Sequence, residues 1–89
     1  MKKIEKWLTD YIAKVDPDFS NLTDGNKLSC DIFHSTSLDS LGIMNVILDA
    51  EKEFNFSFTA DNFQDRRLRT VSGLCEIIEA NLNPNDQKN

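Results

Sequence analysis

The sequence predicts an all-α fold, a four-helix bundle with a long loop between its first two helices and a short third helix. Three observations support this prediction. Apolar residues recur at the helical period in three stretches, strand-like alternation is confined to the segment NFSF, and turn-forming residues gather in one long segment. At 89 residues the core is small, which favours a binding, carrier or adaptor module over an enzyme with a deep active site.

The first helix is expected over residues 2–15, where one apolar stripe follows the helical period. This stripe consists of Ile4, Trp7, Leu8, Tyr11, Ile12 and Val15. The helix should end at Asp16, because the residue before a proline is pushed out of the α region. Residues 16–37 then predict a long loop that five apolar side chains pin to the core: Phe19, Leu22, Leu28, Ile32 and Phe33.

The second helix is expected from Ser40 to about Phe54, and it is apolar on more than one side. Its main stripe consists of Leu41, Met44, Ile47, Leu48 and Phe54, and it is widened by Ile43, Val46 and Ala50. We favour a place in the core for these residues, with contact to a partner or a ligand as the alternative. An apolar interior behind this helix could shelter an acyl chain, but a packed core is the preferred interpretation. That interior consists of Leu41, Met44, Ile47, Phe54, Val71 and Leu74.

The C-terminal part predicts an extended connector and two further helices. Residues 55–58 form the connector, Thr59 or Asp61 caps a short helical turn, and Thr70 caps the last helix. The apolar stripe of that last helix consists of Val71, Leu74, Cys75, Ile77, Ile78 and Leu82. We therefore expect a single domain over residues 1–82 and a polar disordered tail over residues 83–89.

Composition and charge narrow the possible partners and locations. The net charge of −5 disfavours nucleic acid and anionic membranes and favours a basic protein surface. No apolar run is long enough for stable membrane insertion, and charges interrupt any signal sequence near the N-terminus, so we expect a cytoplasmic protein. We also expect it to be a monomer. Cys30 and Cys75 should be unpaired, and a metal site is not expected because His34 is the only histidine.

Asp39 and Ser40 stand where the second helix should begin, and three interpretations compete there. A hydrolase nucleophile is disfavoured because the run from Leu38 to Gly42 lacks the first glycine of GxSxG. An ordinary helix cap would use a side-chain oxygen to accept an unpaired N–H of the first turn. A modification site is compatible with such a cap, since a phosphate-linked group on Ser40 would lie at the positive end of the helix dipole.

The stretch LDSLGIMNVILDAEKEF and the residues after it resemble the acyl carrier protein family. That family has an Asp-Ser-Leu signature at the start of its second helix, an acidic end to that helix before a phenylalanine, a short third helix, and Thr-Val at the start of the fourth. The corresponding residues here are Asp39-Ser40-Leu41, Glu51-Lys52-Glu53-Phe54, Asp61 and Thr70-Val71. The resemblance is specific from Leu38 to Leu82 and concerns topology alone before that.

The resemblance implies a carrier and not an enzyme. Ser40 would receive 4′-phosphopantetheine from coenzyme A through a phosphopantetheinyl transferase with magnesium, and Asp39 would flank the attachment site. An acyl- or aminoacyl-loading ligase would charge the arm with a thioester for a downstream transferase or synthase. Candidate partner-recognition residues are Leu41, Asp49, Glu51, Glu53 and Asp61. The alternative function is a non-catalytic helical adaptor, a protein-interaction domain with an unmodified Ser40.

Departures from the family pattern bear on the type of carrier. Ser37, Gly42 and Asn45 stand where carriers of fatty-acid synthesis usually have a glycine and two acidic residues. This pattern, with FxxxxLxT from Phe63 to Thr70, is more similar to D-alanyl and aminoacyl carriers; fatty-acid, polyketide and nonribosomal-peptide pathways stay open. Three arginines near the third helix form either a basic patch or separate solvated charges: Arg66, Arg67 and Arg69.

Overall fold

The structure is a computed structural model, and it describes residues 1–82. The predicted tail over residues 83–89 lies outside the described residues. Five α-helices and two short 3-10 helices follow one another along the described chain: α1 (Lys3–Val15), η1 (Pro17–Asn21), α2 (Asp24–Ser29), α3 (Ser40–Phe54), α4 (Ala60–Gln64), η2 (Arg66–Arg69) and α5 (Val71–Leu82). Within residues 1–82, β pairing is limited to one isolated bridge between Asp31 and Thr70, so the predicted all-α class is confirmed.

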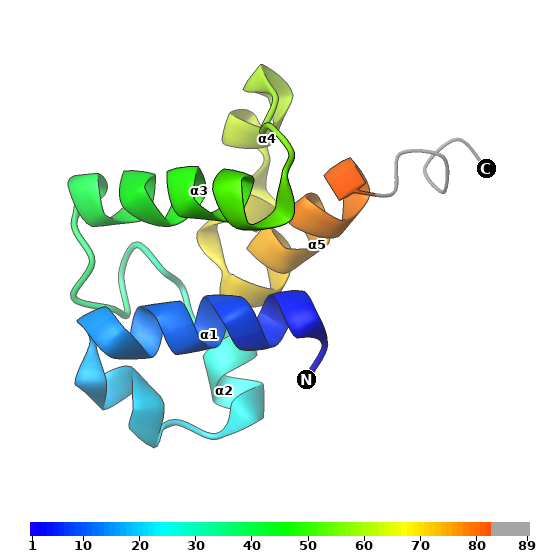
Figure 1. The fold of residues 1–89 in the computed structure, drawn as a ribbon. Coiled ribbons are helices and arrows are strands. Elements are labelled where there is room, and N and C mark those ends of the chain that lie inside the picture. Colours follow the sequence, from blue (N-terminus) through cyan, green and yellow to red (C-terminus); the bar gives the residue numbers. More distant parts are fainter. Residues whose placement is uncertain (83–89) are drawn as a thin grey trace.

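The major helices enclose a single apolar core. Helices α1 and α3 lie side by side and run in opposite directions, while α5 packs against α1 and η2 (Figure 1). The core contains the buried side chains of Leu8, Ile12, Phe19, Cys30, Ile32, Val46, Ile47, Ala50, Phe58, Leu68, Val71, Leu74, Cys75, Ile77 and Ile78. Predicted stripes on α1 and α5 supply much of this core, although Val15 at the end of α1 is exposed.

The buried face of α3 differs from the predicted one. Val46, Ile47 and Ala50 are buried, and Ile43 and Phe54 pack at the edge of the core. Three members of the predicted stripe are instead exposed to solvent: Leu41, Met44 and Leu48. The prediction of a core location was wrong for these three, because an apolar periodicity on two sides of a helix does not say which side meets the neighbouring helices.

The prediction of a plain loop over residues 16–37 was wrong, because the connection between α1 and α3 contains η1 and α2. Pro17 begins η1 with its preset backbone angle, and the Thr23 hydroxyl caps α2 by accepting the N–H of Asn26 at 3.2 Å. Leu22 and Phe33 are exposed, so the expectation that they pin the segment was wrong. The other three predicted anchors do pack inward: Phe19, Leu28 and Ile32.

The predicted caps of the last two α-helices are confirmed. Thr59 accepts the N–H of Asn62 at 3.2 Å, and Thr70 accepts the N–H of Gly73 at 3.0 Å. Gly73 is also required for packing, because a Cβ atom there would lie 2.0 Å from the backbone oxygen of Arg67. The glycine therefore allows η2 to pass directly against the start of α5.

Candidate functional site

Ser40 is the first residue of α3, and its side chain is exposed. Asp39 precedes it as the N-cap, and its Oδ1 accepts the N–H of Gly42 at 2.8 Å. The first N–H groups of an α-helix have no partner within the helix, so those of Ser40 and Leu41 belong to its positive end. Asp39 thus caps the helix while the Ser40 hydroxyl stays accessible, which makes the two predicted roles compatible.

The segment that leads to Ser40 is tied to the end of α1. The buried carboxylate of Asp16 accepts the N–H of Ser37 at 3.0 Å, across 21 residues of chain. The Thr36 hydroxyl donates to the carbonyl of Ile32 at 2.6 Å. These bonds fix where α3 begins relative to the core. Sequence reasoning used Asp16 only as a helix terminator; its partner 21 residues away leaves no local signal.

An apolar cleft of about 240 Å³ opens beside Ser40. Its lining comes from three parts of the chain: Phe33, Ser40, Ile43, Met44, Ile47 and Phe63. Phe33 has two further contacts: the Arg69 guanidinium lies 5.9 Å from its ring centre, and Asp31 accepts its backbone N–H at 2.9 Å. Neither Phe33 nor Phe63 was predicted as part of the cleft, because their proximity to Ser40 depends on long-range packing.

Two of the five predicted recognition residues accept hydrogen bonds within the fold. Asp49 accepts the hydroxyl of Tyr11 on α1, and this hydrogen bond, aided by burial, raises the pKa of Tyr11 to about 12. Glu51 turns the other way and accepts the N–H of Phe58 at 2.7 Å. The remaining three predicted residues are exposed: Leu41, Glu53 and Asp61.

Two of the three clustered arginines are engaged in ion pairs. Arg67 contacts Asp65 at 2.8 Å and Glu76 at 3.4 Å, and its side-chain hydrogen bonds lower the pKa of Asp65. Arg69 lies 3.5 Å from Asp31. These pairs are at least partly exposed, so each adds little stability. The arrangement favours separate, locally balanced charges over a free basic patch.

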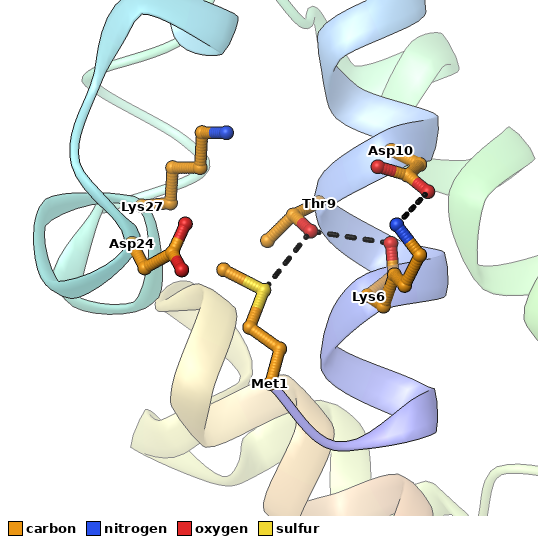
Figure 2. A pocket seen from close by; sticks show the side chains of 6 residues that line it. All are labelled: Met1, Lys6, Thr9, Asp10, Asp24 and Lys27. Carbon is orange, nitrogen blue, oxygen red and sulfur yellow. Dashed lines mark hydrogen bonds and ion pairs between the residues drawn. The ribbon is translucent and has the colours of Figure 1, made fainter.

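A second pocket, of about 270 Å³, lies between α1 and α2 and shares no residue with the cleft at Ser40 (Figure 2). Its lining residues are Met1, Lys6, Thr9, Asp10, Asp24 and Lys27. The Thr9 hydroxyl lies 3.5 Å from the Met1 sulfur, and Lys6 pairs with Asp10 at 3.4 Å. Two lysines and two aspartates balance one another, so the walls favour neither a cation nor an anion.

Both cysteines are free thiols buried in the core. Burial raises the pKa of Cys75 to about 12 and also raises that of Cys30. Because the thiolate is the nucleophilic form, both side chains are poorly suited to thioester chemistry. Ser40, in contrast, is exposed.

Comparison with known proteins places the chain in a family. Acyl carrier proteins from two strains of Porphyromonas gingivalis are each 31% identical to it over 83 residues, which cover 92% of this chain and 99% of theirs. The chain belongs to the acyl carrier protein family. A further acyl carrier protein, from Coprothermobacter proteolyticus, is 33% identical over 55 residues. These residues cover 62% of this chain and 65% of that protein, so the match spans just under two thirds of that protein's length. No protein-family model and no solved structure matches the chain.

Acyl carrier proteins are carriers and not catalysts, which agrees with the predicted class. The long match includes both the Asp39-Ser40 segment and the helices that hold it, since it extends over 92% of this chain. Within residues 1–82, no helix combines the length and apolar character needed to cross a bilayer.

Proposed function

We propose that residues 1–82 act as a single carrier domain that holds acyl or aminoacyl groups as thioesters on a 4′-phosphopantetheine arm attached to Ser40. The observation that carries this proposal is the exposed Ser40 hydroxyl at the start of α3, next to its capping residue Asp39, in a chain of the acyl carrier protein family. The domain then presents its cargo to partner enzymes in the cytoplasm.

Attachment is a phosphoryl-group transfer in which Ser40 is the acceptor. The Ser40 Oγ forms a new bond to the pantetheine-side phosphorus of coenzyme A, and the pyrophosphate bond of coenzyme A breaks. Adenosine 3′,5′-bisphosphate leaves, and the hydroxyl proton is released. A phosphopantetheinyl transferase with magnesium supplies the catalytic groups, so this chain needs only an accessible hydroxyl. Once attached, the arm supplies the terminal thiol that carries the cargo.

The residues around Ser40 suit a phosphodiester. Asp39 uses its Oδ1 on Gly42, and the earlier N–H groups of the turn are directed at the end of the helix where an anion is stabilised. Ser40 also borders the apolar cleft, whose walls Ile43 and Ile47 lie on the same helix. These features support a polar attachment point beside an apolar surface.

The cargo of this carrier is proposed to lie outside bulk fatty-acid synthesis. Gly42 and Asn45 leave the first turns of α3 without the acidic residues usual in carriers of that pathway. Packing alone does not require glycine at position 42, because a Cβ atom there would meet the movable end of the Leu38 side chain, at 2.9 Å, and not the backbone. A D-alanyl or other aminoacyl group fits this pattern, and efficient loading by a malonyl transferase of fatty-acid synthesis would contradict it.

Intact-mass measurement tests the attachment. The apo protein is incubated with coenzyme A, magnesium and a broad-specificity phosphopantetheinyl transferase. We expect a mass gain of one phosphopantetheine in the wild type and none in Ser40→Ala, with Ser37→Ala as the matched control that still accepts the group. An unmodified wild type, or an adduct that persists in Ser40→Ala, would favour the alternative of a helical adaptor with an unmodified serine.

A further inference from the structure

A single buried side chain ties the segment before Ser40 to the end of α1. The carboxylate of Asp16 accepts the backbone N–H of Ser37 at 3.0 Å. Ser40 lies three residues farther along the chain, which is at most about 11 Å even for a fully extended segment. Figure 1 shows the end of α1 beside the connection that leads into α3. This hydrogen bond therefore restrains the position of Ser40 from close by.

The backbone of Asp16 is itself held in place. Its N–H donates to the carbonyl of Ile12 at 2.8 Å, and its carbonyl accepts the N–H of Phe19 at 3.0 Å. Ile12 and Phe19 belong to the apolar core, and Asp16 is only 9% exposed. A restraint that begins at Asp16 therefore fixes the Ser37 segment relative to the core.

Local helix chemistry does not account for the Asp16 carboxylate. Asp16 is the C-cap of α1, where the negative end of the helix dipole disfavours an acidic side chain. It also precedes η1 as the N-cap, but its side chain makes no capping hydrogen bond to residues 17–21. The carboxylate instead contacts a residue 21 positions away. Departures from local rules are expected at functional sites, so the contact with Ser37 calls for a functional reason.

A second side chain holds the same segment. The Thr36 hydroxyl donates to the carbonyl of Ile32 at 2.6 Å and accepts the N–H of Leu38 at 3.3 Å. Asp39 then caps α3 through the N–H of Gly42. Each of the four residues before Ser40 therefore takes part in a hydrogen bond that limits its movement.

Transfer of a phosphoryl group depends on where the accepting hydroxyl lies. A phosphopantetheinyl transferase must bring the Ser40 Oγ in line with the phosphorus of coenzyme A. Displacement of a reacting atom by about 1 Å can lower a rate about 100-fold. The hydroxyl must therefore be fixed relative to the rest of the carrier, and the contacts of Asp16 and Thr36 do this.

We infer that Asp16 is a positioning residue for the modification of Ser40, acting through the backbone N–H of Ser37, with Thr36 as a second support. This inference rests on the proposed attachment at Ser40. Loss of the Asp16 carboxylate releases the Ser37 segment but leaves the helices in place. The carrier then still binds the transferase, but the bound Ser40 hydroxyl is less often in line for transfer.

Loading kinetics test the inference, with the full-length apo protein as the varied substrate of a broad-specificity phosphopantetheinyl transferase at saturating coenzyme A. We expect Asp16→Ala to lower kcat about tenfold and to change KM less than about twofold, because misplacement acts in the bound complex. Asp16→Asn keeps an acceptor oxygen for the Ser37 N–H, so its kcat should stay within about threefold of wild type. Thr36→Val should lower kcat about threefold.

Two controls separate positioning from charge and from stability. Asp18→Ala removes an exposed carboxylate two residues away and should leave kcat within about twofold. Gly73→Ala destabilises the contact between η2 and α5. Partial unfolding lowers the competent fraction, which raises the apparent KM and leaves kcat unchanged. Hydrogen exchange of the Ser37 amide should become at least about tenfold faster in Asp16→Ala and stay unchanged in Asp18→Ala.

Opposite results would overturn the inference. These are a folded Asp16→Ala variant with wild-type kcat, or falls in kcat of the same size in Asp16→Ala and Asp16→Asn. Circular dichroism checks the fold of each variant. If Asp16→Ala loses its helices, Thr36→Val decides, and a wild-type kcat in that variant overturns the inference. A wild type that gains no phosphopantetheine, or a Ser40→Ala variant that gains it, would instead remove the attachment itself, so the two failures are distinguishable.

Discussion

Replacing Tyr11 by phenylalanine should weaken the attachment of α3 to α1. The Tyr11 hydroxyl donates to Asp49, and the pKa of Tyr11 is raised from 10.0 to about 12, chiefly by this hydrogen bond. A rise of that size corresponds to at most about 2.7 kcal/mol. Tyr11 is only half-buried, so solvent screening reduces the contribution to about 1 kcal/mol. For a domain of this size, that loss lowers the Tm by about 4–8 °C.

The pH dependence of this contribution follows from the direction of the pKa change. Because the pKa of Tyr11 is higher in the folded state, the contribution is fully present below pH 10, the ordinary pKa, and is lost as the pH rises toward about 12. The stability difference between wild type and Tyr11→Phe should therefore shrink over that window. Other groups titrate there too, but they affect both proteins equally.

The chain offers two local probes for this measurement. Tyr11 is the only tyrosine, so tyrosinate absorbance reports its pKa directly. Trp7 is the only tryptophan, and its ring centre lies 5.3 Å from that of Tyr11, so its fluorescence reports unfolding. A double-mutant cycle of Tyr11→Phe and Asp49→Ala isolates the pair. The reasoning would be refuted by a tyrosinate pKa near 10 in the folded protein, or by a coupling energy near zero.

Two further substitutions test packing and connector contacts. Gly73→Ala should destabilise the domain by about 1–3 kcal/mol, because the new Cβ atom would meet the backbone of Arg67. The control Gly25→Ala has nothing within 4 Å of its new Cβ atom and should be neutral or stabilising. Equal thermal midpoints for the two variants would contradict this reasoning. Glu51→Gln should lower the free energy of unfolding in urea by about 1 kcal/mol, because it weakens the acceptor of the Phe58 N–H. The control Glu53→Gln should change that free energy by less than about 0.5 kcal/mol. Similar losses in both variants would argue against a specific contact.

Local chemistry explains why so much of the fold was predictable. The first helix ends before Pro17, Thr59 and Thr70 cap α4 and α5, and Asp39 caps α3, all as expected from their sequence neighbours. Capping and proline effects operate within three or four residues, so they are visible in a single sequence. The acyl-carrier signature at Ser40 belongs to this local class.

The elements that were missed depend on contacts between distant residues. The Asp16 carboxylate meets Ser37 across 21 positions, and Tyr11 meets Asp49 across 38. The cleft beside Ser40 needs Phe33 and α4 to converge on α3. No local sequence pattern predicts these long-range contacts. For the same reason, Asp49 and Glu51 were predicted to be available to partners although both accept hydrogen bonds within the fold.

The sequence by itself therefore determined the helical class, most helix boundaries and the position of Ser40 at the start of a helix, because each of these follows from neighbouring residues. The tertiary structure decided which face of α3 is buried. Apolar residues on two sides of that helix made both orientations compatible with its periodicity. Only the packing of α3 against α1 and the shared core, which buries Val46 and Ala50, left Leu41, Met44 and Leu48 exposed to solvent.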